Sequence, residues 1–211
     1  MKKTRVSFPS GELVLEGISA IPEGAGPFPA VIVCHPHPLY GGSMDNNVVS
    51  SLSETLTQAS LASFKFNFRG VGESQGEFGQ GVGEREDVEA AISFISTVKE
   101  VDSKRIGLAG YSAGAGFALP VGFSDARIRA LAAVSPPLLM FDFNFLKSCP
   151  KPKLLISGSR DNFVPADQFL EFCQNLPEPK EYESIEGADH FWWGYESSLA
   201  AKAAAFFIKV L

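Results

Sequence analysis

Histidine and cysteine are both scarce in this 211-residue sequence, with three residues of each type. The number of cysteines is odd and no Cys-x-x-Cys motif occurs, so the sequence indicates neither a disulfide framework nor a zinc ribbon. This cysteine content fits a reducing cytoplasm best, and Cys34, inside an apolar run, is expected to be a small core residue. The chain is long enough to bury a hydrophobic core without covalent staples.

Two further absences narrow the classes of function. No apolar run reaches the roughly 20 residues that a membrane-spanning helix needs, so no membrane partner is expected. Basic residues are outnumbered, with 18 lysines and arginines against 24 acidic residues and no basic cluster, which disfavours a nucleic-acid partner. No apolar stretch follows the basic first residues, so no secretory signal is visible and a cytoplasmic location is expected.

Short apolar runs alternate with stretches whose apolar residues recur at helical spacing, which is typical of parallel strands joined by crossover helices. Strands are expected at residues 4–8, 13–21, 30–34, 62–68, 105–110, 129–134, 153–158 and 180–185. Helices are expected at residues 44–59, 84–98, 113–121, 166–175 and 192–210. The prediction is a single α/β domain over residues 1–211, with a doubly wound, mostly parallel sheet, helices on both faces and an antiparallel start.

The segment Gly110-Tyr111-Ser112-Ala113-Gly114 fits the pattern Gly-x-Ser-x-Gly between a buried strand and an apolar helix. A sharp turn of this kind strains the serine backbone and lifts its hydroxyl above the sheet. The flanking glycines avoid clashes with the neighbouring strand and helix. The alternative is an ordinary glycine-rich turn, but its position between strand and helix favours Ser112 as a nucleophile.

A serine hydroxyl needs a base before it can act as a nucleophile at neutral pH. His190 lies between the last expected strand and the last expected helix, in a loop at the sheet edge where ligands bind. The alternative is a surface histidine packed on Trp192 or Trp193. We expect His190 to be the base.

The base in turn needs a carboxylate that fixes its tautomer and stabilises the imidazolium. Asp161 lies in the loop that follows the expected strand at residues 153–158. Asp167 is expected inside the next helix, and Asp189 adjoins His190, which usually points the two side chains apart. We therefore expect Asp161 to orient His190, with a salt bridge to Arg160 or a lysine as the alternative.

The loop after the strand at residues 30–34 is expected to supply one backbone N–H to an oxyanion hole, and Ala113 the other. Pro36 and Pro38 have no N–H, which leaves His37, Leu39 and Tyr40. By analogy with a His-Gly-x loop we favour His37, and Leu39 and Tyr40 remain alternatives.

His35 and His37 are spaced so that they could chelate a metal, but no third ligand is evident nearby. Hydrogen bonds from the two imidazoles to loop backbone are the simpler interpretation. We predict no metal and no cofactor.

These residues together resemble the α/β-hydrolase superfamily, and more narrowly its small, lidless, dienelactone-hydrolase-like serine hydrolases. The resemblance rests on His35-Pro36 with residues 41–46, on residues 66–74, and on the order Ser112, Asp161, His190. It implies an α/β-hydrolase fold without a cap domain, and cleavage of a small ester or similar acyl bond through an acyl-enzyme. Dienelactone hydrolases proper use a cysteine nucleophile, so the serine argues against dienelactone itself. Arg69 is expected to buttress loops.

Many relatives carry a lid where this chain has only residues 135–152, which leave room for a loop and a short helix around residues 141–146. We therefore expect an open, shallow site for small or exposed acyl substrates. Its expected walls are Tyr40, Leu138, Phe141, Phe163 and Trp192. A homodimer remains an alternative to the monomer, because a second copy of the chain could cover the pocket.

A catalytically inactive ligand-binding or interaction protein on the same scaffold is the main alternative, because a fold alone does not establish activity. The presence of all three expected catalytic residues argues against it. Dinucleotide binding is a third hypothesis, since Gly70-x-Gly72 follows a strand. There the next glycine comes one residue late, at Gly76.

Overall fold

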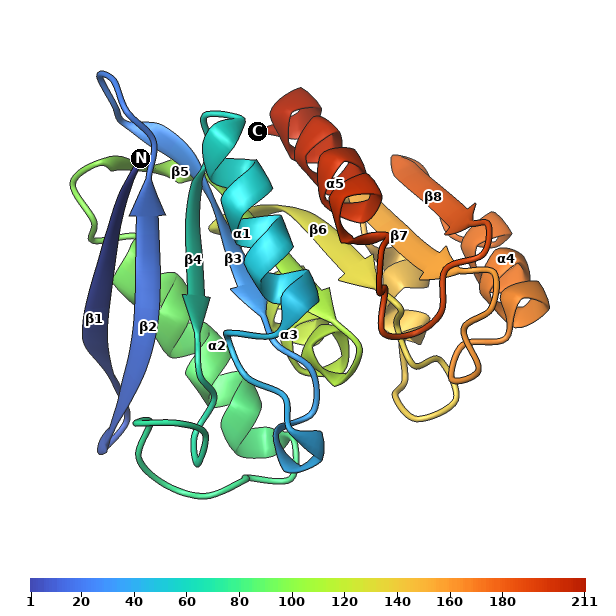
Figure 1. Ribbon diagram of the computed structural model, residues 1–211, viewed down its shortest axis with the longest axis horizontal. Helices are drawn as coiled ribbons and strands as arrows, with labels where there is room; N and C mark the ends of the chain where they lie inside the picture. The colour runs from blue at the N-terminus through green and yellow to red at the C-terminus, as the bar shows by residue number, and fades with distance from the viewer.

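The computed structural model describes residues 1–211 and contains one eight-stranded sheet with helices on both faces (Figure 1). The strands are β1 (Lys2–Ser10), β2 (Leu13–Ile21), β3 (Phe28–Cys34), β4 (Ala62–Phe66), β5 (Val101–Tyr111), β6 (Ile128–Val134), β7 (Lys153–Gly158) and β8 (Lys180–Ile185). The α-helices are α1 (Asn47–Gln58), α2 (Val82–Ile95), α3 (Ala113–Ser124), α4 (Ala166–Gln174) and α5 (Glu196–Val210). Two 3₁₀ helices, η1 (Pro38–Tyr40) and η2 (Asn144–Ser148), lie in loops. The doubly wound α/β fold predicted from the sequence is confirmed.

The strand order is β1-β2-β4-β3-β5-β6-β7-β8. β1 pairs antiparallel with β2, and β2 antiparallel with β4, while the strands from β4 to β8 pair in parallel. Cys34 of β3 lies opposite Gly110 of β5, and Tyr111 lies opposite Val134 of β6. Because these strands end in register, the loops that follow them leave the sheet at one edge.

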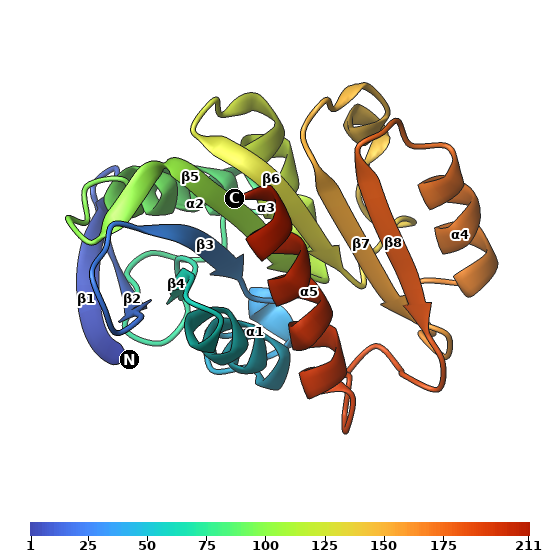
Figure 2. The same ribbon diagram turned by 90° about the horizontal axis from the view of Figure 1, so that it is seen from above.

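Helices cover both faces of the sheet, and the views of Figures 1 and 2 place α1 and α5 on one face and α2 and α3 on the other. The side chains of α1 and α5 join one buried apolar cluster, and those of α2, α3 and α4 join the second. This double cover explains the unbroken apolar run of β3, whose Ala30–Cys34 stretch is completely buried. Burial of each valine or isoleucine side chain in this stretch contributes roughly 1.5–3 kcal/mol.

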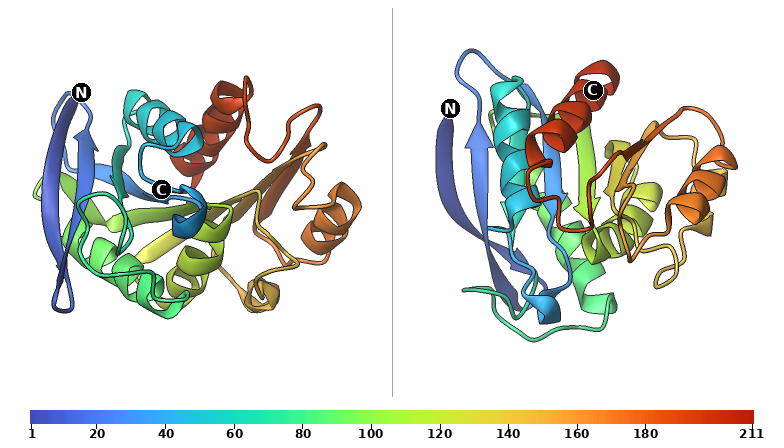
Figure 3. Two further views of the ribbon diagram at one scale, coloured as in Figure 1. Left: turned by 60° about the horizontal axis from the view of Figure 1, so that its bottom comes forward. Right: turned by 45° about the vertical axis from the view of Figure 1, so that its right-hand side comes forward.

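The crossovers diverge around β3, which lies between β4 and β5 in the sheet. The chain passes from β3 to α1 on one face and from β5 to α3 on the other. At such a switch point the two loops separate and leave a crevice at the carboxyl ends of the strands. The left panel of Figure 3 brings this end forward, with the loop that carries η1 close to its centre.

Two helix starts differ from the sequence prediction for local reasons. α1 begins at Asn47 rather than at residue 44, because the Asn46 side chain accepts the Val48 N–H and caps the helix there. α5 begins at Glu196 rather than at residue 192, because Trp192 has a positive φ of 63° that no helix accommodates. Residues 186–195 therefore form a longer loop than predicted.

The segment between β6 and β7 forms no cap over the sheet edge. Its only helical element is η2, which is a 3₁₀ helix that begins later than the short helix expected around residues 141–146. The structure is therefore lidless, as predicted. None of its helices is both long enough and apolar enough to cross a membrane.

Candidate active site

Ser112 lies at the turn between β5 and α3 in a strained backbone conformation, with φ 53° and ψ −126°. Its N–H donates to Val134 O at 2.8 Å, which continues the pairing of β5 with β6 up to the turn. The first N–H groups of α3 lie next to this turn, and they have no acceptors within the helix. The half-buried hydroxyl therefore lies at a positively polarised helix start.

The two glycines that flank this turn have no room for a side chain. A Cβ on Gly110 would collide with the backbone of Ala115, and one on Gly114 would collide with the carbonyl oxygens of Cys34 and His35. The glycine spacing of the motif is thus required by close backbone contact between β5, α3 and the loop after β3.

The structure brings Ser112, His190 and Asp161 together from three separate loops. His190 Nε2 lies 3.0 Å from Ser112 Oγ, and His190 Nδ1 lies 2.8 Å from Asp161 Oδ2. The Asp161 side chain is fully buried and the His190 side chain is 10% exposed. A neutral His190 with its proton on Nδ1 donates to the carboxylate, and its Nε2 then accepts the serine hydroxyl.

Asp161 is held in place by its own loop, since its Oδ1 accepts the N–H groups of Phe163 and Val164 at 2.9 and 3.1 Å. The two competing carboxylates lie elsewhere. Asp167 is an exposed residue in the first turn of α4. Asp189 accepts the N–H groups of Phe191 and Trp192, and so closes a turn just beyond His190.

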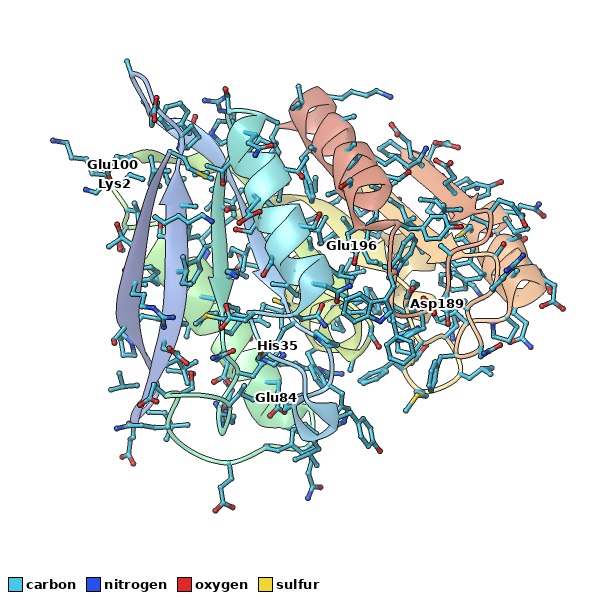
Figure 4. All side chains as sticks on the ribbon, in the orientation of Figure 1. Lys2, His35, Glu84, Glu100, Asp189 and Glu196 are labelled. Atoms are coloured by element: carbon cyan, nitrogen blue, oxygen red, sulfur yellow. The ribbon has the colours of Figure 1, made fainter.

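Two residues, Tyr111 and Asn47, anchor the His190 loop, and no sequence pattern predicted either role. Tyr111 Oη donates to the His190 carbonyl at 2.7 Å, and burial raises the pKa of this hydroxyl. Asn47 Nδ2 donates to the Phe191 carbonyl and to Glu196 Oε1, both at 2.9 Å. Figure 4 labels Glu196, the first residue of α5, and Asp189, in the loop before it. The partners in these hydrogen bonds lie far apart along the chain, so no local pattern could have indicated them.

The loop after β3 leaves only one of the three candidate amides without an acceptor inside the protein. Leu39 N–H donates to His37 Nδ1 at 3.2 Å, and Tyr40 N–H donates to the His37 carbonyl at 3.1 Å. The His37 N–H makes no such bond. His37 also lines the same pocket as Ser112 and Ala113.

His35 holds this loop against the turn that follows β4. Its Nδ1–H donates to the Pro36 carbonyl at 2.7 Å, and its Nε2 accepts the Phe68 N–H at 3.0 Å. Because Pro36 O and the His37 N–H belong to one planar peptide group, the first bond also fixes the direction of that N–H. Both ring nitrogens therefore serve loop backbone, as the simpler interpretation of the histidine pair predicted.

The His35 ring is expected to stay neutral far into the acid range. Burial lowers its pKa to about 4, against an ordinary 6.5. Because the folded-state pKa lies below the unfolded one, the neutral ring contributes its full share to the free energy of unfolding above pH 6.5. This contribution is lost as the pH falls toward 4, by up to about 1.4 kcal/mol per pH unit. Ring-proton NMR across pH 7.5–4 measures the pKa of His35 directly, and a ring that titrates near 6.5 would contradict the expectation.

A pocket of about 530 Å³ opens beside Ser112. Tyr40, Phe141 and Phe163 line it, together with His37, Tyr111 and His190. No Asp, Glu, Lys or Arg is among its 15 lining residues. A largely apolar wall with a few polar groups is typical of a small-molecule site of this volume.

Two of the predicted walls are wrong. Trp192 is completely buried in the cluster under α5, where its Nε1–H donates to Ser135 Oγ, and Phe191 lines the pocket instead. The turn closed by Asp189 directs the larger ring inward. Leu138 packs against the core beside η2, and Met140 takes its expected place because residues 137–141 form a tight turn.

The turn after β4 is built around an ion pair rather than around a phosphate site. Arg69 Nη2 and Nε bind Asp87 of α2 at 2.8–3.1 Å, and the Arg69 N–H donates to the same carboxylate at 2.9 Å. β4 is followed by a long loop instead of directly by a helix, so the glycines here lack the strand–turn–helix context of a dinucleotide fingerprint. Arg69 buttresses loops, as predicted.

The chain is similar to proteins of one well-defined group. A family model described as an alpha/beta hydrolase domain matches residues 30–205. The uncharacterized protein RP471 of Rickettsia prowazekii (strain Madrid E) is 36% identical over 172 residues, which are 78% of this chain and 72% of RP471. Two further curated relatives, from Escherichia coli, are longer, since the match covers 42% of each.

Solved structures agree with this grouping. An alpha-beta serine hydrolase homologue from Coxiella burnetii has a TM-score of 0.86 at 33% identity, over 96% of this chain and 98% of its own. XC6422 from Xanthomonas campestris, described as an a/b serine hydrolase without lid, has a TM-score of 0.86 at 26% identity. That match covers 99% of this chain and 94% of XC6422.

Proposed function

Because this chain belongs to the alpha/beta hydrolase domain family, we propose that it is a serine hydrolase that cleaves small carboxylic esters. Ser112 is the nucleophile, His190 the general base and Asp161 the residue that orients the base. The observation that carries the proposal is the continuous hydrogen-bond chain from Ser112 Oγ through His190 to the buried Asp161, beside a pocket without charged side chains.

Acylation begins when Ser112 Oγ attacks the ester carbonyl carbon while His190 Nε2 takes the hydroxyl proton. Asp161 stabilises the imidazolium that forms, because its carboxylate already accepts the proton on Nδ1. His190 then protonates the leaving oxygen, the bond between the carbonyl carbon and that oxygen breaks, and the alcohol departs. The acyl group stays on Ser112 until a water molecule, activated by His190, releases it as the acid.

The Ala113 and His37 amides are the proposed oxyanion donors. Ala113 is the first residue of α3, where helix N–H groups lack internal acceptors. The loop bonding favours His37 over Leu39 and Tyr40, whose N–H groups already donate within the loop. A donor of this kind is worth about 2.7–4 kcal/mol in the transition state, because charge develops on the oxygen only there.

Labelling with a fluorophosphonate probe tests the proposal, since this reagent phosphonylates an activated serine. We expect stoichiometric label on the peptide that contains Ser112, and no label on the Ser112→Ala variant. Mass spectrometry of the digested protein identifies the site. Label that persists in the alanine variant, or that falls on another serine, removes Ser112 as the nucleophile.

A further inference from the structure

Two exposed phenylalanines flank the ring of His190 on the pocket side. Phe163 comes from the loop between β7 and α4, and Phe191 from the loop between β8 and α5. Their ring centroids lie 4.7 and 5.8 Å from that of His190, and their planes cross at 87° with centroids 6.4 Å apart. Both are more than half exposed, at 52% and 53%, and both line the pocket. Neither ring is needed to fill the core.

The position of these rings matters because of what His190 does in the proposed reaction. To protonate the leaving oxygen, Nε2 must come within about 3 Å of it. The group attached to that oxygen therefore starts beside the His190 ring, where Phe163 and Phe191 stand. The acyl group would then lie against Met140 and Phe141, which line the pocket from the loop between β6 and β7.

We propose that Phe163 and Phe191 form the subsite for the leaving alcohol, and that this subsite selects an uncharged aromatic alcohol. This inference rests on the proposed serine hydrolase function and names the substrate class of that site. Two rings set nearly perpendicular let a third ring stack on one and meet the edge of the other, and both are favoured geometries for aromatic pairs.

The electrostatics of the subsite exclude a negatively charged alcohol. No lysine or arginine lines the pocket, and the buried Asp161 carboxylate lies directly behind His190. An anion moved from water to this wall would lose its hydration without gaining a partner. A quaternary ammonium group is the one charged alternative, since aromatic faces also attract cations.

The Phe191 side chain can be removed without disturbing its loop. The loop is held through backbone atoms, since Asn47 donates to the Phe191 carbonyl and Asp189 accepts the Phe191 N–H at 3.0 Å. Trp193 offers a matched control, because it lies in the same loop, is 71% exposed and does not line the pocket. Phe191→Leu separates the loss of a flat ring from the loss of apolar bulk.

A series of acetate esters tests the proposal, because every acetate passes through the same acetyl-enzyme. We expect Phe191→Ala to lower kcat/KM for benzyl acetate about 10-fold and for ethyl acetate less than about twofold, with Phe191→Leu in between. Trp193→Ala is expected to change neither value. Single-turnover deacetylation is expected to keep the wild-type rate in all variants, which a general disturbance of the site would not allow.

Equal losses for ethyl and benzyl acetate, or a slower deacetylation, would overturn the assignment of the subsite. Faster hydrolysis of acetylcholine than of the neutral 3,3-dimethylbutyl acetate would overturn the requirement for an uncharged alcohol. Failure of the proposed function looks different, because wild-type protein would then hydrolyse none of these acetates and Ser112 would not react with the fluorophosphonate probe.

Discussion

Ser112→Ala is expected to lower kcat for ester hydrolysis roughly 10⁴- to 10⁶-fold while the protein keeps its fold. The substitution removes one oxygen from a half-buried position, and alanine can keep the same backbone as the serine it replaces. Binding and the oxyanion amides remain, so a small residual rate over the uncatalysed reaction is expected. Initial rates with a reactive ester, together with a thermal unfolding curve, measure both parts of the expectation.

The same loss is expected for His190→Ala, and the double variant is expected to lose little more than either single variant. Residues that act as one unit in one step are strongly non-additive, because removing either already abolishes that step. Multiplicative losses in the double variant would mean that Ser112 and His190 work separately, despite the 3.0 Å between Oγ and Nε2. Such a result would refute the proposed acylation step.

Asp161→Asn is expected to lower kcat about 10⁴-fold with little change in stability. The amide oxygen can still accept the Phe163 and Val164 N–H groups that Oδ1 of Asp161 accepts now. The amide nitrogen would then face His190 Nδ1 and donate to it, which moves the ring proton to Nε2. A ring protonated at Nε2 cannot take the proton from Ser112, so the base is lost while the geometry stays.

Asp189→Asn is the matched control for this variant. Its carboxylate belongs to the same loop as His190 but accepts only backbone N–H groups, which an asparagine oxygen can also accept. We expect kcat within about threefold of wild type, because an asparagine side-chain oxygen keeps both hydrogen bonds that close the turn. If both asparagine variants lose activity alike, the effect of Asp161 is a matter of loop structure rather than of the His190 tautomer.

The three candidate catalytic residues show which parts of the site local sequence patterns can predict. The sharp turn at Ser112 was predictable because the residues that define it are close together in the sequence. A buried strand, two required glycines and a helix lie within a short segment. Asp161 and His190 were predictable because parallel strands end at one edge, so residues that follow β7 and β8 meet those that follow β5.

The pocket walls were less predictable, because the direction of a loop side chain depends on distant packing. The sequence Phe191-Trp192-Trp193 offers three aromatic rings in a row. Only the turn at Asp189 and the space under α5 decide that Trp192 points into the core and Phe191 into the pocket. The same holds for Leu138 and Met140 between β6 and β7.

The sequence alone determined the layered fold and the identity of the three candidate catalytic side chains. The spacing of apolar residues, the glycine spacing and the order of Ser112, Asp161 and His190 can all be read directly along the chain. The tertiary structure decided which loop amide is left free, which rings line the pocket beside Ser112, and how Tyr111 and Asn47 hold the His190 loop. Those outcomes depend on hydrogen bonds between residues that only the folded chain brings together.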